Sequence, residues 1–160
     1  MNAVSEFADS IEAAGVTVLL LGGLPGSGKS PFSEELESRG WLRFDDYQKN
    51  ALGDSDQFRG AASFEELVRA VAAGKRCVVT DIRFIYAEYR DGALRALREV
   101  PGDHLVQLRL FENDPAQCTR NVGEATDRDT KRRLENISFW SRRYSLPSGT
   151  VAIPVLRRNS

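Results

Sequence analysis

The sequence predicts an α/β fold in three layers, with a parallel sheet of about five strands between helices. Short runs of apolar, often β-branched residues alternate along the chain with segments whose apolar residues recur at helical spacing. The first such run, "VTVLLLGG" at 16–23, is apolar almost throughout, as in a strand covered on both faces. Strands that alternate with helices are typical of a parallel sheet with helices packed on each side.

The elements follow in order along the chain. We expect strands at five apolar runs, 16–23, 41–47, 76–81, 104–112 and 150–156. Helices are expected between them, before Gly15, from the glycine-rich turn to about Ser38, at 64–73 and 87–100, after Asp114 and Pro115, and at 130–144. Pro154 confines the last strand to a sheet edge or a strand end, because proline cannot donate to the ladder.

Length and composition favour a single domain spanning 1–160. A chain of 160 residues with 41% hydrophobic residues can bury one core of ordinary size. Lys and Arg total 22 against 23 for Asp and Glu, so any surface for nucleic acid must be local. We expect no membrane association and a cytoplasmic location, because the start lacks a secretory signal and no apolar run approaches the roughly 20 residues of a membrane span.

One motif carries most of the functional signal. Gly23, Gly28, Lys29 and Ser30 have the spacing G-x-x-x-x-G-K-S between an expected strand and an expected helix, which is the context of a phosphate-binding loop. The residues expected to hold a nucleotide are Gly23, Gly26, Ser27, Gly28, Lys29 and Ser30. Lys29 would pair with the β- and γ-phosphates of ATP, and the Ser30 hydroxyl would ligate Mg²⁺. The alternative is a glycine-rich turn with a chance lysine.

Pro31 follows this motif directly. Proline is acceptable in the first turn of a helix, where N–H groups lack intrahelical partners. The residue at this position in such loops commonly offers its N–H to the α-phosphate, and proline has none. One hypothesis is therefore that nucleotide is held mainly through the β- and γ-phosphates, at some cost in affinity. The other is a neutral helix-start proline.

Asp45 and Asp46 end the second expected strand, in "RFDDYQKN". Ligands of parallel α/β proteins lie beyond the carboxyl ends of the strands, so a carboxylate here could accept the proton of an attacking hydroxyl. The alternative is a pair of helix-capping residues.

"GLPGSGKS" followed by "RFDDYQKN" resembles the phage-type polynucleotide 5′-kinases, whose phosphate-binding loop is followed by a strand ending in Asp-Asp-Tyr. This resemblance implies a P-loop kinase fold with a helical lid, with Asp45 as general base and Asp46 beside the substrate. The arginine that follows the tyrosine in that family is Gln48 here. The departure removes a positive contact and weakens the prediction of a 5′-end substrate in particular.

"CVVTDIRF" places Asp81 at the end of the third expected strand, where it could organise Mg²⁺, or could equally cap a helix. The segment also resembles the "DVRF" segment of deoxynucleoside monophosphate kinases, which would put Arg83 on the acceptor side. The alternative for Arg83 is an ion pair with a surface acid.

"LRLFENDPAQCTRN" is similar to the polynucleotide-kinase segment that runs from the fourth strand into the lid, here about 120–133. Arg120 would then be a lid arginine. The family's second lid arginine is replaced by Glu124, so we take Arg128 as its substitute. Lid cations would neutralise charge on the transferring phosphoryl group.

The resemblance implies an ATP- and Mg²⁺-dependent kinase whose catalytic residues are Lys29, Asp45, Arg120 and Arg128. The expected acceptor is a hydroxyl on a nucleic acid, DNA being favoured: a 5′-hydroxyl or the hydroxymethyl group of a modified base such as 5-hydroxymethyluracil. Two alternatives stay open. One is a small-molecule kinase acting on a nucleoside monophosphate, a sugar or an antibiotic, and the other is a nucleotide-binding switch without phosphotransfer.

Overall fold

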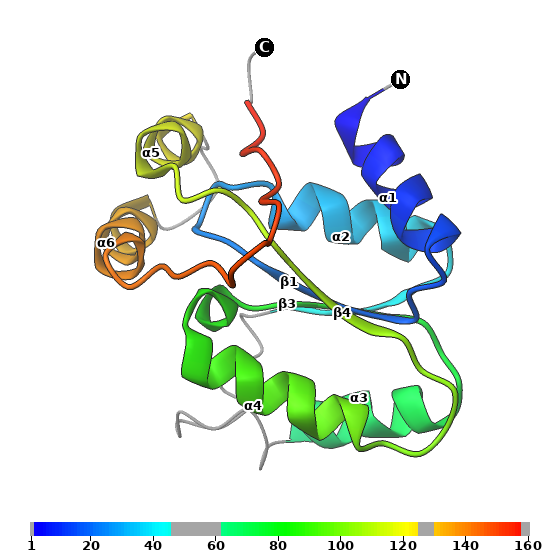
Figure 1. The fold of residues 1–160 in the computed structure, drawn as a ribbon. Helices are drawn as coiled ribbons and strands as arrows, with labels where there is room; N and C mark the ends of the chain where they lie inside the picture. Colours follow the sequence, from blue (N-terminus) through cyan, green and yellow to red (C-terminus); the bar gives the residue numbers. More distant parts are fainter. Residues whose placement is uncertain (1, 46–61, 125–129, 158–160) are drawn as a thin grey trace.

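The computed structural model describes residues 2–45, 62–124 and 130–157, and it confirms an α/β fold with a parallel sheet (Figure 1). The strands are β1 (Val18–Gly22), β2 (Leu42–Phe44), β3 (Cys77–Thr80) and β4 (Val106–Leu110). The helices are α1 (Ala3–Ala13), α2 (Lys29–Ser38), α3 (Ala62–Ala72), α4 (Ala87–Arg98), α5 (Pro115–Gly123) and α6 (Thr130–Ser141), with a 3₁₀ helix η2 (Ile82–Ile85) after β3.

The sheet within the described residues has four strands rather than about five, in the order β2-β3-β1-β4 with all neighbours parallel. The last predicted strand contributes a single bridge, between Phe111 and Ile153. Ile153 donates its N–H to the Leu110 carbonyl and accepts from the Glu112 N–H, both at 2.8 Å. Beyond this bridge the Glu112 carbonyl accepts from the Asp114 N–H at 3.0 Å instead of continuing the ladder. Alternate residues of a strand turn their N–H groups to opposite sides, so Pro154 is tolerated on the side away from Phe111.

β1 is the centre of the molecule, because its alternate side chains enter two separate cores. Val18 and Leu20 pack in the cluster that includes Leu67 of α3 and Leu97 of α4. Leu19, the residue between them, packs with the residues of α1 and α2 on the other face. All these side chains of β1 are fully buried, as the uninterrupted apolar run predicts. Figure 1 shows α1 and α2 on one side of the sheet and α3 and α4 on the other.

The parallel strands bring their carboxyl ends to one edge of the sheet. β1 runs there into the glycine-rich loop, Asp45 follows β2, and Asp81 follows β3. Helices α5 and α6 and the C-terminal segment 153–157 lie at the same end of the molecule (Figure 1). Residues far apart in the sequence therefore meet at this edge.

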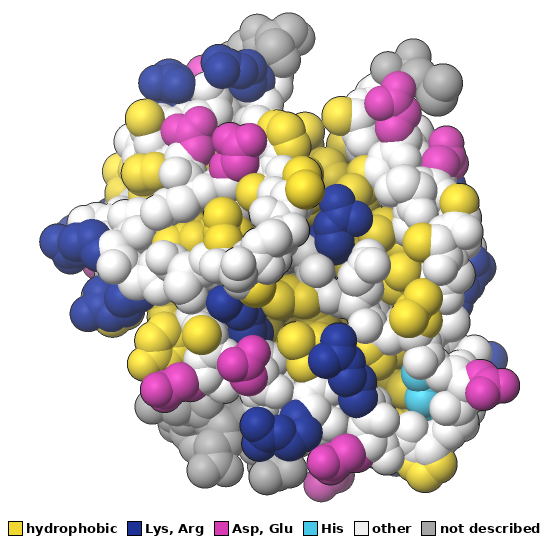
Figure 2. Space-filling model, viewed as in Figure 1, with side chains coloured by type: hydrophobic (Ala, Val, Ile, Leu, Met, Phe, Trp, Pro, Cys, Tyr) yellow, Lys and Arg dark blue, Asp and Glu magenta, His cyan; other side chains and the backbone are white. Residues whose placement is uncertain are grey.

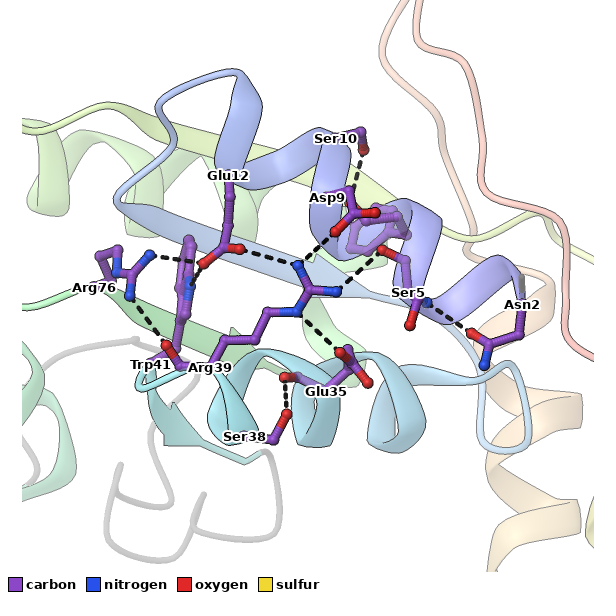
Figure 3. Close-up of polar contacts among 11 residues, drawn as sticks. Asn2, Ser5, Asp9, Ser10, Glu12, Glu35, Ser38, Arg39, Trp41 and Arg76 are labelled. Carbon is purple, nitrogen blue, oxygen red and sulfur yellow. Dashed lines mark hydrogen bonds and ion pairs between the residues drawn. The ribbon is translucent and has the colours of Figure 1, made fainter.

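At the other end of α2, Arg39 ties α1 to the rest of the fold (Figure 3). Its guanidinium contacts Asp9 at 2.7 Å and Glu12 at 3.0 Å on α1, and Glu35 at 2.9 Å on its own helix. Glu12 also accepts hydrogen bonds from Trp41 and Arg76. The hydrogen bond from Trp41, followed by that from Arg39, lowers the pKa of Glu12 below its ordinary value of 4.5.

Because the pKa of Glu12 is lowered by folding, its charged form stabilises the fold above pH 4.5, and this contribution is lost as pH falls through the folded-state value. We expect Glu12→Gln to reduce the free energy of unfolding at pH 7 by about 1 kcal/mol. The difference from wild type should shrink below pH 4.5, as followed by urea unfolding across pH. Glu6→Gln, on the exposed first turn of α1, is the control. A difference that does not change with pH would contradict the assignment.

Candidate functional site: a phosphate-binding loop beside two strand-end carboxylates

The loop at 23–28 has a backbone that glycine alone accommodates. Gly26 and Gly28 have φ values of 84° and 122°, which side chains rarely adopt. A Cβ on Gly26 would lie 2.7 Å from the Cys118 carbonyl oxygen, and one on Gly28 would lie 2.9 Å from Leu156. The glycine spacing thus serves both the curl of the loop and its close packing.

Five of the six loop carbonyls are hydrogen-bonded within the described part of the protein. They accept hydrogen bonds as follows: Gly23 from Lys29 Nζ (2.6 Å), Leu24 from Ser27 N (3.1 Å), Gly26 from Asn121 Nδ2 (2.8 Å), Ser27 from Leu156 N (3.0 Å) and Gly28 from Phe32 N (3.2 Å). α2 begins at Lys29 with no side-chain cap on its first N–H groups. Such groups have no intrahelical partner and form a ready site for an anion.

Ser27 supplies a second indication that the loop is shaped for a ligand. Its side chain is fully buried, and its hydroxyl has no hydrogen-bond partner among the described residues. A buried hydroxyl without a partner is unfavourable, and such groups are rare. Together with the amino end of α2 and the ammonium of Lys29, this donor suits the oxygens of a triphosphate.

Asp45 lies directly after β2 and is nearly buried, with 9% of its surface exposed. Arg43 forms a bidentate ion pair with it, from Nε to Oδ1 at 2.9 Å and from Nη2 to Oδ2 at 2.8 Å. The Thr80 hydroxyl donates to Oδ1 at 3.0 Å. Burial works to lower the pKa of Arg43, but the hydrogen bond and charge of Asp45 outweigh it and the pKa is raised. Among the described residues, Oδ1 therefore has two donors and Oδ2 has one.

Asp81 is fully buried at the end of β3 and caps η2 by accepting from the Arg83 N–H at 2.8 Å. The Arg83 side chain binds both carboxylate oxygens, at 3.1 and 2.9 Å, and the Tyr89 hydroxyl donates to Oδ2 at 3.0 Å. Burial, then the charge of Asp81, raises the pKa of Tyr89, which keeps it a donor. Direct binding of Mg²⁺ by Asp81 would require Arg83 to leave, whereas the Ser30 hydroxyl is exposed at the start of α2 and suits the ion.

The strand order brings the predicted residues to one edge without making them neighbours. β3 lies between β1 and β2, so Asp45 stands two strand spacings from the loop, about 10 Å. Arg120 is on α5, the helix whose Cys118 carbonyl lies against Gly26. The predicted residues Asp46, Gln48 and Arg128 lie outside the described residues.

Four residues at the site escaped the sequence analysis: Arg43, Thr80, Gln117 and Asn121. Gln117 and Asn121 are both buried on α5 and are joined by a hydrogen bond of 2.9 Å. Their spacing of four residues beside the apolar Cys118 and Val122 is a weak signal, since polar residues on the buried face of a helix need partners.

Comparisons with known proteins assign no activity to this chain. No family model matches the chain. An uncharacterized protein of Acanthamoeba polyphaga mimivirus is 26% identical over 129 residues, which cover 81% of this chain and 86% of that protein. A gluconokinase from Sinorhizobium meliloti 1021 is 17% identical with a TM-score of 0.49, covering 88% of this chain and 83% of the other.

The parallel order of strands and the loop between β1 and α2 are consistent with a P-loop kinase fold. The mimivirus protein has no described activity, so the finer resemblance to polynucleotide kinases and to the "DVRF" segment stays a prediction. None of the helices in the described ranges combines the length and apolar character of a membrane span.

Gly28→Ala tests whether the loop needs its conformation. The new Cβ would meet Leu156 at 2.9 Å in a backbone with φ of 122°, so we expect a loss of about 2 kcal/mol in unfolding free energy. Gly92→Ala in α4 is the control, because its Cβ has nothing within 4 Å, and alanine should stabilise that helix by up to about 1 kcal/mol. Both are measured by urea unfolding, and equal effects at the two sites would refute the expectation.

Proposed function

We propose that this protein is a phosphotransferase of the P-loop kinase type, which uses ATP with Mg²⁺. The observation that carries this proposal is the pairing of two features at one edge of the sheet. The glycine loop suits a triphosphate, because it carries the Lys29 ammonium and the buried Ser27 hydroxyl, which has no hydrogen-bond partner within the described part of the chain. The carboxylate of Asp45, oriented by Arg43, follows β2, which is separated from β1 by one strand.

The loop and Lys29 bind and orient the triphosphate in this mechanism. The Lys29 ammonium donates to the Gly23 carbonyl, and it would turn from there to the β- and γ-phosphates. The Ser30 hydroxyl would hold Mg²⁺, which neutralises phosphate charge when bound. Arg120, and Arg128 if it lies in a lid, would add positive charge around the transferring group.

Asp45 takes the proton in this proposal. The acceptor oxygen forms a bond to the γ-phosphorus, the bond from that phosphorus to the β–γ bridging oxygen breaks, and ADP leaves with the bonding electrons. The hydroxyl proton passes to Asp45, through Oδ2 because Oδ1 already has two donors. Arg43 orients the carboxylate through both of its oxygens.

For the acceptor, the resemblance of "RFDDYQKN" to polynucleotide kinases supports a hydroxyl on a nucleic acid, either a 5′-end or a hydroxymethylated base. Two observations favour the alternative of a small-molecule acceptor. Basic and acidic side chains lie among one another on the face in Figure 2, without a basic tract. Arg83 is held rigidly at the end of β3, where a guanidinium could bind a small anionic acceptor.

Asp45→Asn tests the base, with transfer of labelled γ-phosphate as the readout. The acceptors are DNA with free 5′-hydroxyls, DNA with hydroxymethylated bases, nucleoside monophosphates and sugars. We expect kcat to fall at least 100-fold on the active acceptor, with ATP affinity within about twofold of wild type. Asp9→Asn, on exposed α1, is the matched control. Retained turnover would remove Asp45 from this role, and ATP binding without transfer to any acceptor would favour the switch.

Pro31→Ala and Pro31→Thr test the missing amide. Pro31 is exposed in the first turn of α2, where its lack of an N–H costs the helix nothing. Both variants restore an N–H that can reach the α-phosphate, so we expect ATP to bind about fivefold more tightly in each. Pro101→Thr, before β4 at the other end of the sheet, is the control. Unchanged affinity in both variants would mark Pro31 as a neutral helix-start residue.

A further inference from the structure

Asn121 joins three segments that the sequence keeps far apart. Its side-chain amide nitrogen donates to the Gly26 carbonyl at 2.8 Å and to the Leu156 carbonyl at 2.5 Å. Leu156 in turn donates its N–H to the Ser27 carbonyl at 3.0 Å. These hydrogen bonds form a closed ring through the phosphate-binding loop, α5 and the C-terminal segment 153–157.

The orientation of this amide is fixed on both sides. Two carbonyl oxygens face its nitrogen, and its oxygen accepts from Gln117 Nε2 at 2.9 Å. The Gln117 oxygen accepts from Arg120 at 2.8 Å and from Arg157 at 3.2 Å. Asn121 and Gln117 are 3% and 6% exposed, so these bonds are shielded from water, where a lost partner is costly.

Packing leaves the loop little room to move without α5. The Cys118 carbonyl of α5 lies 2.7 Å from a Cβ position on Gly26, and the Val122 side chain lies 3.0 Å from it. Leu156 closes the other flank against Gly28. A loop carbonyl that lost its partner here could turn inward and displace an N–H group from the centre of the loop.

We propose that Asn121 is a positioning residue that sets the loop for the triphosphate, and that it does so by anchoring the Gly26 and Leu156 carbonyls. This inference rests on the proposed phosphate-binding role of the loop. Asn121 carries no charge and needs no contact with the nucleotide. It holds the loop in shape through α5, the helix that also carries Arg120.

The test compares Asn121→Ala with wild type by ATP kinetics and by amide hydrogen exchange. We expect the KM for ATP to rise about tenfold, because two shielded hydrogen bonds are lost, with kcat within about threefold. Exchange of the Leu156 amide should quicken about tenfold without ATP, while that of Val79 in β3 stays unchanged. Asn113→Ala is the matched control, because that amide donates only to Ser141 at the surface among the described residues.

Asn121→Asp keeps the shape of the side chain, but it replaces the amide nitrogen with an oxygen. That oxygen would face the Gly26 and Leu156 carbonyl oxygens and could not donate to them. This variant should fold and raise the KM further than alanine does. If amide exchange became faster to the same extent at Leu156 and Val79, Asn121 would only stabilise the fold as a whole, and the proposal would be overturned. A fall in kcat at constant KM, or no change at all, would also overturn it. If wild type binds no ATP, the proposed function fails, while the exchange comparison still decides whether Asn121 anchors the loop.

Discussion

The site depends on keeping the carbonyl oxygens of the loop engaged, so that its N–H groups are left for an anion. Three of the partners come from three separate elements: Phe32 from the first turn of α2, Asn121 from α5, and Leu156 from the end of the described chain. A short loop of glycines would otherwise sample many conformations, and fixing it costs conformational entropy. Folding the rest of the chain supplies that order before any ligand arrives, which is the condition for efficient electrostatic stabilisation.

Two arginines neutralise the strand-end carboxylates, each from a position two residues away. Arg43 reaches Asp45 because alternate residues of a strand share one face, and Arg83 reaches Asp81 because η2 turns the chain back. Both pairs are bidentate and largely buried. The near balance of charges in the whole chain is thus repeated locally at these two strand ends.

The alternation of apolar runs predicts the layers well, because a strand buried on both faces leaves little choice of residues. It fails for the last strand, which contributes one bridge at Ile153 within the described residues. Ile153 and Val155 are buried, but Val151 is 79% exposed, so the segment lacks the continuous burial of a central strand. The strand-end rule places Lys29, Asp45 and Asp81 at one edge from spacing alone. This rule does not predict the ion pair between Arg83 and Asp81 or the hydrogen bond from Asn121 to the Gly26 carbonyl. Such contacts depend on how side chains pack once the chain has folded.

β2 has three residues and stands at one edge of the described sheet, where β3 is its single partner among the described strands. Elements with few backbone hydrogen bonds open and shift at the lowest free-energy cost. Asp45, the proton acceptor in the proposed mechanism, thus follows the shortest strand of the described sheet, while the loop follows the central one. In the proposed mechanism, the distance between Asp45 and the nucleotide could then adjust to acceptors of different size, while the loop that binds the nucleotide stays in place.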